Sequence, residues 1–242
     1  MSAMLDVDEH HWWYRGRRAI IAQELGRLPL APDAHVLDAG CGSGRTLLEL
    51  SRFGAVSGIE LHEDAAALAR SRGDFDVRIG RLEELPWPEA TFDLITCLDV
   101  IEHTANDVVA LAELRRVSRP GARLLVTVPA YQALWSRHDV ANHHYRRYSR
   151  RMLGRAATAA GWNVERMTSF NSLLLAPAAI VRLAQRGRSL EDGYKSDLHL
   201  GPAWLNRGLE WPLLMEARWL SRGSRLPAGL SLLAVMRNAS GG

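Results

Sequence analysis

Short apolar runs and amphipathic stretches alternate along the 242-residue chain. Runs typical of buried strands lie at 35–40, 55–60, 75–80, 92–99, 122–129, 163–170 and 230–237. Stretches with helical spacing lie between them at 45–54, 62–73, 107–121 and 150–162, and each ends at or beside a glycine. This alternation predicts an α/β fold, with right-handed crossovers and a mostly parallel sheet that helices cover on both faces.

The order of strands and helices also predicts where a ligand would bind. In parallel sheets of this kind, ligands bind beyond the carboxyl ends of the strands. We therefore expect the chemistry in the loops that follow the first five strands, after Asp38, Glu60, Gly80, Asp99 and Pro129. The first of these loops carries the clearest pattern.

The sequence VLDAGCGSGR places Gly40, Gly42 and Gly44 directly after the first strand. Glycines at this spacing allow the backbone to turn sharply and to approach a ligand closely, near a helix N-terminus. A dinucleotide-binding loop would have its third glycine where this chain has Arg45, so the pattern differs from that fingerprint. Glu60 ends the second strand about 20 residues further on, where a carboxylate can hold both hydroxyls of a ribose. The alternative is an ordinary glycine-rich turn with an incidental acid.

The composition excludes several classes of protein. Hydrophobic residues make up 47% and charged residues 24%, and a net charge of +3 is too small to argue nucleic-acid binding. Two cysteines are too few for a disulfide framework or a cysteine zinc site. The N-terminus lacks an apolar signal region, and the longest uncharged stretch (167–181) is shorter than the ~18–20 residues of a membrane-spanning helix. We expect a soluble, cytoplasmic protein of one domain.

Four motifs together resemble class I S-adenosylmethionine-dependent methyltransferases over roughly residues 34–170. They are VLDAGCGSG, the acid Glu60, GRLEELPWPEATFDLITCLDVIEH and LRRVSRPGARLLVTVP. The resemblance implies a Rossmann-like, seven-stranded sheet whose last strand runs antiparallel. It also implies a single domain with N-terminal lid helices (1–33), a cofactor-binding core (34–170), a helical insertion between strands six and seven (171–222), and a final strand with its tail (223–242).

The resemblance assigns the cofactor as S-adenosylmethionine and the product as S-adenosylhomocysteine. It implies that Asp38 and the glycine loop hold the methionine end, and that Glu60 holds the ribose hydroxyls. Many relatives have an acid after the glycine of strand three, whereas this chain has Arg81, so the adenine contact would pass to Glu83 or to a main-chain carbonyl. The residues expected at the cofactor are Tyr14, Arg17, Asp38, Gly40, Gly42, Gly44, Glu60, Leu61, Arg81, Leu82, Glu83, Leu98 and Asp99.

Asp99, Glu102 and His103 follow strand four at spacing i, i+3, i+4, so a helical turn would place them on one face. His103 could then be a general base for a hydroxyl acceptor. A divalent-metal site is the second interpretation, because quinone O-methyltransferases carry a similar acidic run and carboxylates suit Mg²⁺. The third is a purely structural role. We expect no metal to be required.

The segment HDVANHHYRRYSRR (138–151) follows strand five, where substrate-facing loops are common in this class. A zinc site is disfavoured because the histidines lack third and fourth ligands. A nucleic-acid strand could bind such a basic and aromatic mix, but the N-P-P-Y and Pro-Cys motifs of base-modifying enzymes are absent. We expect a pocket lip in which His138 and His144 are candidate bases and Tyr131, Trp135, Arg147 and Tyr148 contact the substrate.

Two flanking segments complete the prediction. EHHWWYRGRR (Glu9–Arg18) resembles a lid helix, in which Trp12 and Trp13 would either wall the acceptor or dock the helix on the core. The insertion (Asn171–Arg222) is amphipathic, with three tryptophans beside arginines. It could roof the pocket, form a homodimer face or lie on a membrane surface. We favour a roof over an apolar acceptor.

The best-supported function is therefore methyl transfer to a small molecule, most simply to a hydroxyl in secondary or lipid-linked metabolism. N- or C-directed transfer to a small molecule, or transfer to nucleic acid or protein, is the alternative, and a macromolecular substrate would require a broad basic face. A non-catalytic protein with the cofactor fold is disfavoured, because Asp38, the three glycines and Glu60 are all present. No nucleic-acid partner is expected.

Overall fold

The computed structural model describes residues 10–184 and 203–239. Their contacts define two compact units that are interleaved along the chain. The helical unit comprises the described parts of Met1–Leu28, Ala130–Arg147 and Thr168–Ser231. The sheet unit comprises those of Pro29–Pro129, Tyr148–Met167 and Leu232–Gly242.

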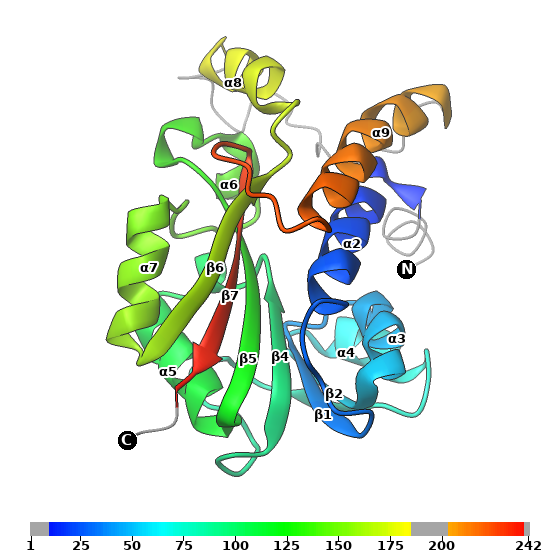
Figure 1. Ribbon diagram of the computed structural model, residues 1–242, viewed down its shortest axis with the longest axis vertical. Helices are drawn as coiled ribbons and strands as arrows, with labels where there is room; N and C mark the ends of the chain where they lie inside the picture. The colour runs from blue at the N-terminus through cyan, green and yellow to red at the C-terminus, as the bar shows by residue number, and fades with distance from the viewer. Residues whose placement is uncertain (1–9, 185–202, 240–242) are drawn as a thin grey trace. The chain divides into compact units, whose positions relative to one another are not determined.

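A seven-stranded sheet has the strand order β3-β2-β1-β4-β5-β7-β6 (Figure 1). The strands β1 to β5 pair in parallel, and β7 and β6 complete an antiparallel end, which confirms the predicted sheet. The bounds are β1 Ala34–Ala39, β2 Gly54–Glu60, β3 Asp76–Ile79, β4 Phe92–Leu98, β5 Ser118–Pro129, β6 Trp162–Phe170 and β7 Ser231–Asn238. The central strands are buried along most of their length, as expected for a parallel sheet that is covered on both faces.

The helices of the sheet unit follow from apolar spacing and end-capping. In α5 (Asp107–Val117) the buried residues Ala110, Leu111 and Leu114 share one face, and the Asn106 side chain caps the first turn by accepting from the Val109 N–H at 3.2 Å. The remaining helices are α3 Arg45–Leu50, the 3₁₀ turns η1 Ser51–Phe53 and η2 Ile101–His103, α4 Glu63–Arg70 and α7 Arg150–Ala159.

The helical unit contains α2 (Trp12–Leu25), η3 (Gln132–Leu134), α6 (Arg137–Ala141), α8 (Leu175–Ala184) and α9 (Ala203–Leu220). Helices α2 and α9 lie side by side and run in the same direction (Figure 1). A Cβ on Gly16 would lie 2.3 Å from Leu213 Cδ1, so the close approach requires glycine there. Arg15 Nε donates to Glu210 at 2.9 Å, and Arg27 donates to the terminal Leu220 carbonyl at 2.8 Å. Helices are present at both predicted places, near the N-terminus and between β6 and β7, although Glu9 and residues 185–202 lie outside the described residues. Their roles as lid and roof stay predictions.

Among the predicted helix ends, those at Gly73 and Trp162 lie beyond the observed helices, and the end of the helix at 107–121 is wrong. The stretch 107–121 was expected to be helical up to its Pro-Gly pair, but α5 ends at Val117 and Ser118 begins β5. The hydrogen bonds explain the early ending, because the Asn238 side chain donates to the Ser118 carbonyl and hydroxyl at 3.1 and 2.9 Å. Arg119 also pairs with Asp93 on β4, which holds the chain extended against that strand.

Within residues 10–184 and 203–239, no helix is both long enough and apolar enough to cross a bilayer.

Candidate functional site

The glycine loop after β1 depends on conformations that favour glycine. Gly40, Gly42 and Gly44 have φ angles of +82°, +53° and +80°. A Cβ on Gly40 would lie 2.5 Å from Val100 Cγ2, and one on Gly44 would lie 2.6 Å from Ala69 Cα. A Cβ on Gly42 would meet no atom within 4 Å. The outer glycines are therefore packed against protein, while Gly42 borders open space that a ligand could occupy.

Glu60, at the end of β2, is bonded directly to this loop. One carboxylate oxygen accepts from the Gly42 N–H at 3.0 Å, and the other accepts from the His62 N–H at 3.0 Å. The N–H groups of Gly40 and Cys41 donate to the Ile59 carbonyl. Because each carboxylate oxygen offers two lone pairs, these bonds leave acceptor capacity on both oxygens. The predicted ribose-binding acid therefore lies beside the predicted loop.

Asp38 lies under the loop, only 2% exposed, and accepts a 2.6 Å hydrogen bond from the fully buried Thr96 hydroxyl on β4. Cys41, inside the loop, is also buried. Burial and the nearby charges of Asp38 and Glu60 raise the pKa of the Cys41 thiol, which stays protonated. Neither a nucleophilic nor a metal-binding role suits this cysteine.

The expected adenine-side residues form the next turns of the sheet unit. The Gly80 N–H donates to the Glu60 carbonyl at 3.0 Å, and Arg81 and Glu84 close an antiparallel bridge. Within this turn Leu82 is buried, Arg81 is exposed and Glu83 is half-buried. Leu61 is exposed, and Leu98 is buried at the end of β4. Apolar side chains and a carboxylate are thus available beside β2 and β3.

The expected helical turn at Asp99–His103 is wrong. Asp99 has a left-handed φ of +58°, and only Ile101–His103 form a short 3₁₀ turn. The Asp99 N–H donates to the Thr127 carbonyl on β5, which turns the chain at the strand end. Glu102 is buried and His103 is exposed, but a ligand atom of each lies within 4.8 Å of the other, so this pair could still contribute to a metal site.

In the helical unit, the Asp139 network joins Ser136, Asp139, His144 and Arg147. The Asp139 carboxylate is fully buried and accepts from His144 Nδ1 at 2.9 Å and from Arg147 Nε at 2.8 Å. It also accepts from the Ser136 N–H and hydroxyl, which forms a capping box for α6. Burial alone would raise the pKa of Asp139, but the hydrogen bond from His144 and the Arg147 charge hold it well below its usual range.

Several other predicted substrate residues lie on the segment after β5. His138 lies edge-on to His144, with ring centroids 6.2 Å apart. Tyr131 and Trp135 flank η3 and are half-buried. Tyr148 belongs to the sheet unit, where it is fully buried and donates to Asp107 at 2.7 Å. Its hydroxyl therefore anchors the start of α5.

The aromatic residues of α2 pack within the helical unit. The Trp13 ring stacks on Phe170 at 5.8 Å with an interplanar angle of 12°, and Trp12 lies edge-on to Trp13. The Arg17 guanidinium lies over the Tyr14 ring at 5.6 Å. The stacking on Phe170 supports docking for Trp13, and the cofactor contacts of Tyr14 and Arg17 stay predictions.

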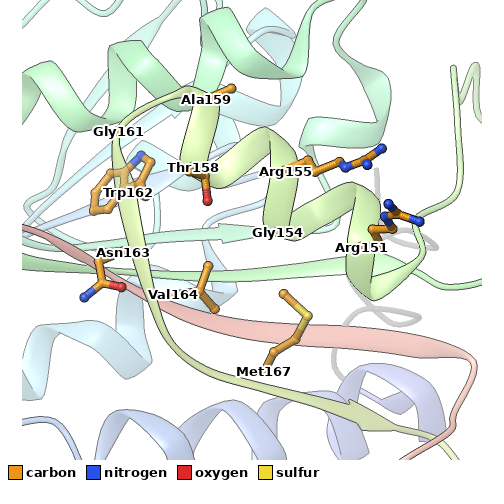
Figure 2. Close-up of a pocket in the computed structure, with 10 residues that line it drawn as sticks. All are labelled: Arg151, Gly154, Arg155, Thr158, Ala159, Gly161, Trp162, Asn163, Val164 and Met167. Carbon is orange, nitrogen blue, oxygen red and sulfur yellow. The ribbon is translucent and has the colours of Figure 1, made fainter.

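An open groove of about 910 Å³ lies between α7 and β6, within the sheet unit (Figure 2). Arg151 and Arg155 extend from α7 beside it, while Val164 and Met167 line it from β6. In the sheet, β4, β5 and β7 lie between β6 and the glycine-loop strand β1. None of the predicted site residues lines this groove, so we do not assign it to the cofactor.

Sequence reasoning missed three residues that organise the predicted sites: Thr96, Asp139 and Phe170. Thr96 lies inside a run that reads simply as a buried strand, although a hydroxyl there is a weak sign of a buried polar partner. Asp139 could have been found from its spacing, since the Ser136-to-Asp139 pattern is typical of a helix start. Nothing in the sequence pairs Phe170 with Trp13.

Comparison with known proteins gives one match to a protein family. Residues 37–126 match the protein family described as "Methyltransferase domain". This region runs from β1 into β5 and includes the glycine loop and Glu60. This region is therefore similar to known methyltransferase domains, which supports the predicted resemblance to class I S-adenosylmethionine-dependent methyltransferases.

Individual relatives are also named as methyltransferases. The chain is 35% identical over 125 residues to a "Probable S-adenosylmethionine-dependent methyltransferase" of Mycolicibacterium smegmatis, covering 50% of this chain and 47% of that protein. It is 34% identical over 130 residues to a ubiquinone biosynthesis O-methyltransferase of Hahella chejuensis, covering 48% and 55%. The matches thus span about half the length of these relatives.

A solved methyltransferase in complex with the Haloferax volcanii Trm112 activator has a similar fold. The TM-score is 0.64 at 18% identity, over 97% of this chain and 92% of that one. At this identity the likeness describes the fold alone.

Proposed function

We propose that this protein is an S-adenosylmethionine-dependent methyltransferase that acts on a small molecule, most simply on a hydroxyl group. One observation carries the proposal: the Glu60 carboxylate is bonded to the Gly42 N–H, beside a loop of left-handed glycines that borders open space. The names of the relatives, several of which are O-methyltransferases, support the choice of a hydroxyl acceptor.

The residues of this loop suit the proposed cofactor. The open space at Gly42 would be filled by any larger side chain, and Glu60 retains the acceptor capacity that two ribose hydroxyls require. Asp38 would serve the methionine end, while Leu61 and Leu82 would contact adenine. When bound, S-adenosylmethionine supplies an electrophilic methyl group on a positively charged sulfur. The protein itself must orient the acceptor, exclude water and remove a proton.

We assign the proton acceptor to His144. The Asp139 carboxylate is ionised and lies 2.9 Å from His144 Nδ1, so in the neutral ring the proton sits on Nδ1 and the lone pair on Nε2. A buried carboxylate that fixes the tautomer and orientation of a histidine also stabilises the imidazolium that forms when the base accepts a proton. His138 and His103 are the remaining candidates.

The cofactor assignment is tested by replacing Glu60. Glu60→Ala removes the acceptor for the ribose hydroxyls, so the affinity for S-adenosylhomocysteine should fall by about 1.5–3 kcal/mol in calorimetric titration. Glu63→Ala is the matched control, because Glu63 is an exposed acid three residues further along the chain, paired at 3.4 Å with Arg70. Unchanged affinity in Glu60→Ala would contradict the assignment.

The acceptor class is tested separately with purified protein, S-adenosylmethionine and small panels of phenols, alcohols, amines and thiols. Mass spectrometry then locates the added methyl group. We expect it on oxygen. Methylation of nitrogen or carbon alone would retain the methyltransferase assignment and overturn the hydroxyl acceptor.

A further inference from the structure

The outer face of α9 carries an aromatic stripe formed by Trp204, Trp211, Met215 and Trp219. These residues are spaced by seven, four and four positions, so they lie along one side of the helix. The three tryptophans are 73%, 60% and 58% exposed. Exposed side chains of this size are unusual on a soluble surface, and three in a row indicate a contact surface.

The opposite side of the same helix is already occupied. Leu213, Ala217 and Leu220 are buried, and the close Leu213–Gly16 contact packs α9 on α2 (Figure 1). The aromatic stripe is therefore not the face by which α9 joins the helical unit.

The acidic side chains of α9 are buried, whereas its basic side chains are exposed. Its two acids, Glu210 and Glu216, are both buried. Glu210 accepts from Arg15, and Glu216 accepts from the N–H groups of residues 171, 172 and 173. Beside the stripe, in contrast, Arg207 and Arg218 are exposed, and Arg222 follows directly after the helix. All exposed charges along α9 are consequently positive.

We propose that the aromatic stripe of α9, with its flanking arginines, binds the surface of an anionic lipid bilayer. Tryptophan combines an apolar ring with one polar N–H and is suited to the depth of lipid headgroups. Arginine stems cover apolar surface while their guanidinium groups bind phosphate. A helix with these two features and no exposed acid lies in the plane of the interface.

A second copy of the chain fits the same face poorly. A two-fold contact brings identical surfaces together, so the arginines of both copies would enter the interface. Neither α9 has an exposed carboxylate to pair with them, and burying unpaired charges is costly. Lipid phosphates supply the missing negative charge. None of the stripe residues is among the proposed cofactor residues, so the inference stands whichever acceptor the enzyme uses.

The test is co-sedimentation of the full chain with phosphatidylcholine vesicles, with and without phosphatidylglycerol. The wild-type protein should sediment with the anionic vesicles and much less with the neutral ones. Each of Trp211→Ser and Trp219→Ser should weaken partitioning about tenfold, because each removes a large apolar side chain from the interface. Each of Arg207→Gln and Arg218→Gln should weaken it about fivefold, only on anionic vesicles.

Met152→Ser and Arg151→Gln on α7 are matched controls, since both side chains are exposed on another helix, and neither should change partitioning. Unchanged thermal unfolding of all variants shows that the fold is retained. The proposal is overturned if the wild-type protein does not sediment with anionic vesicles, or if the tryptophan variants bind as well as it does. It is also overturned if sedimentation velocity detects a dimer that the tryptophan substitutions abolish.

Discussion

The glycine loop of the sheet unit and the Asp139 network of the helical unit both gather polar atoms, but they are built from different parts of the chain. The loop presents backbone groups, set by three left-handed glycines and the Gly42 N–H. The Asp139 network presents side chains, with donors from three residues on one buried carboxylate. A site built from backbone is sensitive to the volume of a substituted side chain, whereas a site built from side chains is sensitive to charge.

The largest effect should come from the side chain assigned as base. His144→Ala should reduce turnover by about 10²–10⁴-fold, as is usual for a lost general base, while the affinity for S-adenosylhomocysteine stays near that of the wild type. His138→Ala should cost less, because the buried Asp139 carboxylate accepts from His144 and not from His138. The measurement is turnover beside calorimetric titration, with Arg151→Ala as the control.

Wild-type turnover in both histidine variants would overturn the assignment and leave His103 as the remaining candidate. Arg150 is a poorer control than Arg151, because it donates to the Met167 carbonyl at 3.0 Å.

The second largest effect should be a loss of stability when the charge of Asp139 is removed. Asp139→Asn removes the negative charge that faces the buried Arg147 guanidinium, so the free energy of unfolding should fall by about 3–5 kcal/mol in urea titrations. Asp64→Asn, at an exposed position in the first turn of α4, is the control and should change little. A loss no larger than that of Asp64→Asn would show that the network contributes no stability.

Protonation of Asp139 at low pH should have the same effect on stability as Asp139→Asn. The pKa of Asp139 is lower in the folded than in the unfolded protein, so its contribution is present above the unfolded value of about 4. It is lost as the pH falls through the lower, folded value. The stability difference between the wild type and Asp139→Asn should therefore be constant near neutrality and shrink below about pH 4, by urea titration at each pH.

The third prediction compares two glycines of the same loop. Gly44→Ala adds a Cβ 2.6 Å from Ala69 Cα in a left-handed conformation, so about 2–5 kcal/mol of stability should be lost. Gly42→Ala meets no neighbour, so only about 1–2 kcal/mol should be lost. In Gly42→Ala, however, the added methyl group enters the open space. It should therefore lower the affinity for S-adenosylhomocysteine by more than about tenfold. If Gly42→Ala binds normally, that space is not the ligand site.

The smallest effect should come from chelation. Asp99 has a left-handed backbone outside the 3₁₀ turn, so only Glu102 and His103 of the acidic run lie on that turn, with ligand atoms within 4.8 Å of each other. Turnover should be the same with and without EDTA. Full dependence on added Mg²⁺ would instead assign a metal to these residues.

The loop was predictable from the sequence because its conformations restrict the choice of residue. Positions 40, 42 and 44 have positive φ angles, which favour glycine, so the glycines indicate the turn directly. The place of Glu60 at the end of the second strand could be predicted from the strand spacing. The Asp139 network was not predictable, because an aspartate in a polar segment is ordinarily solvated and only tertiary packing buries it. The same reason applies to Asp99, whose left-handed turn depends on its bond to Thr127 in another strand.

The interleaving of the two units restricts how the protein can be divided or rebuilt. The chain passes between them at Leu28–Pro29, Pro129–Ala130, Arg147–Tyr148, Met167–Thr168 and Ser231–Leu232. No truncation from either terminus can therefore remove one unit and leave the other whole. The helical unit consists instead of three segments, of which one precedes β1, one follows β5 and one connects β6 to β7. A chimaera that exchanges these segments between related chains would keep every parallel strand and would show whether the helical unit determines the acceptor that we propose.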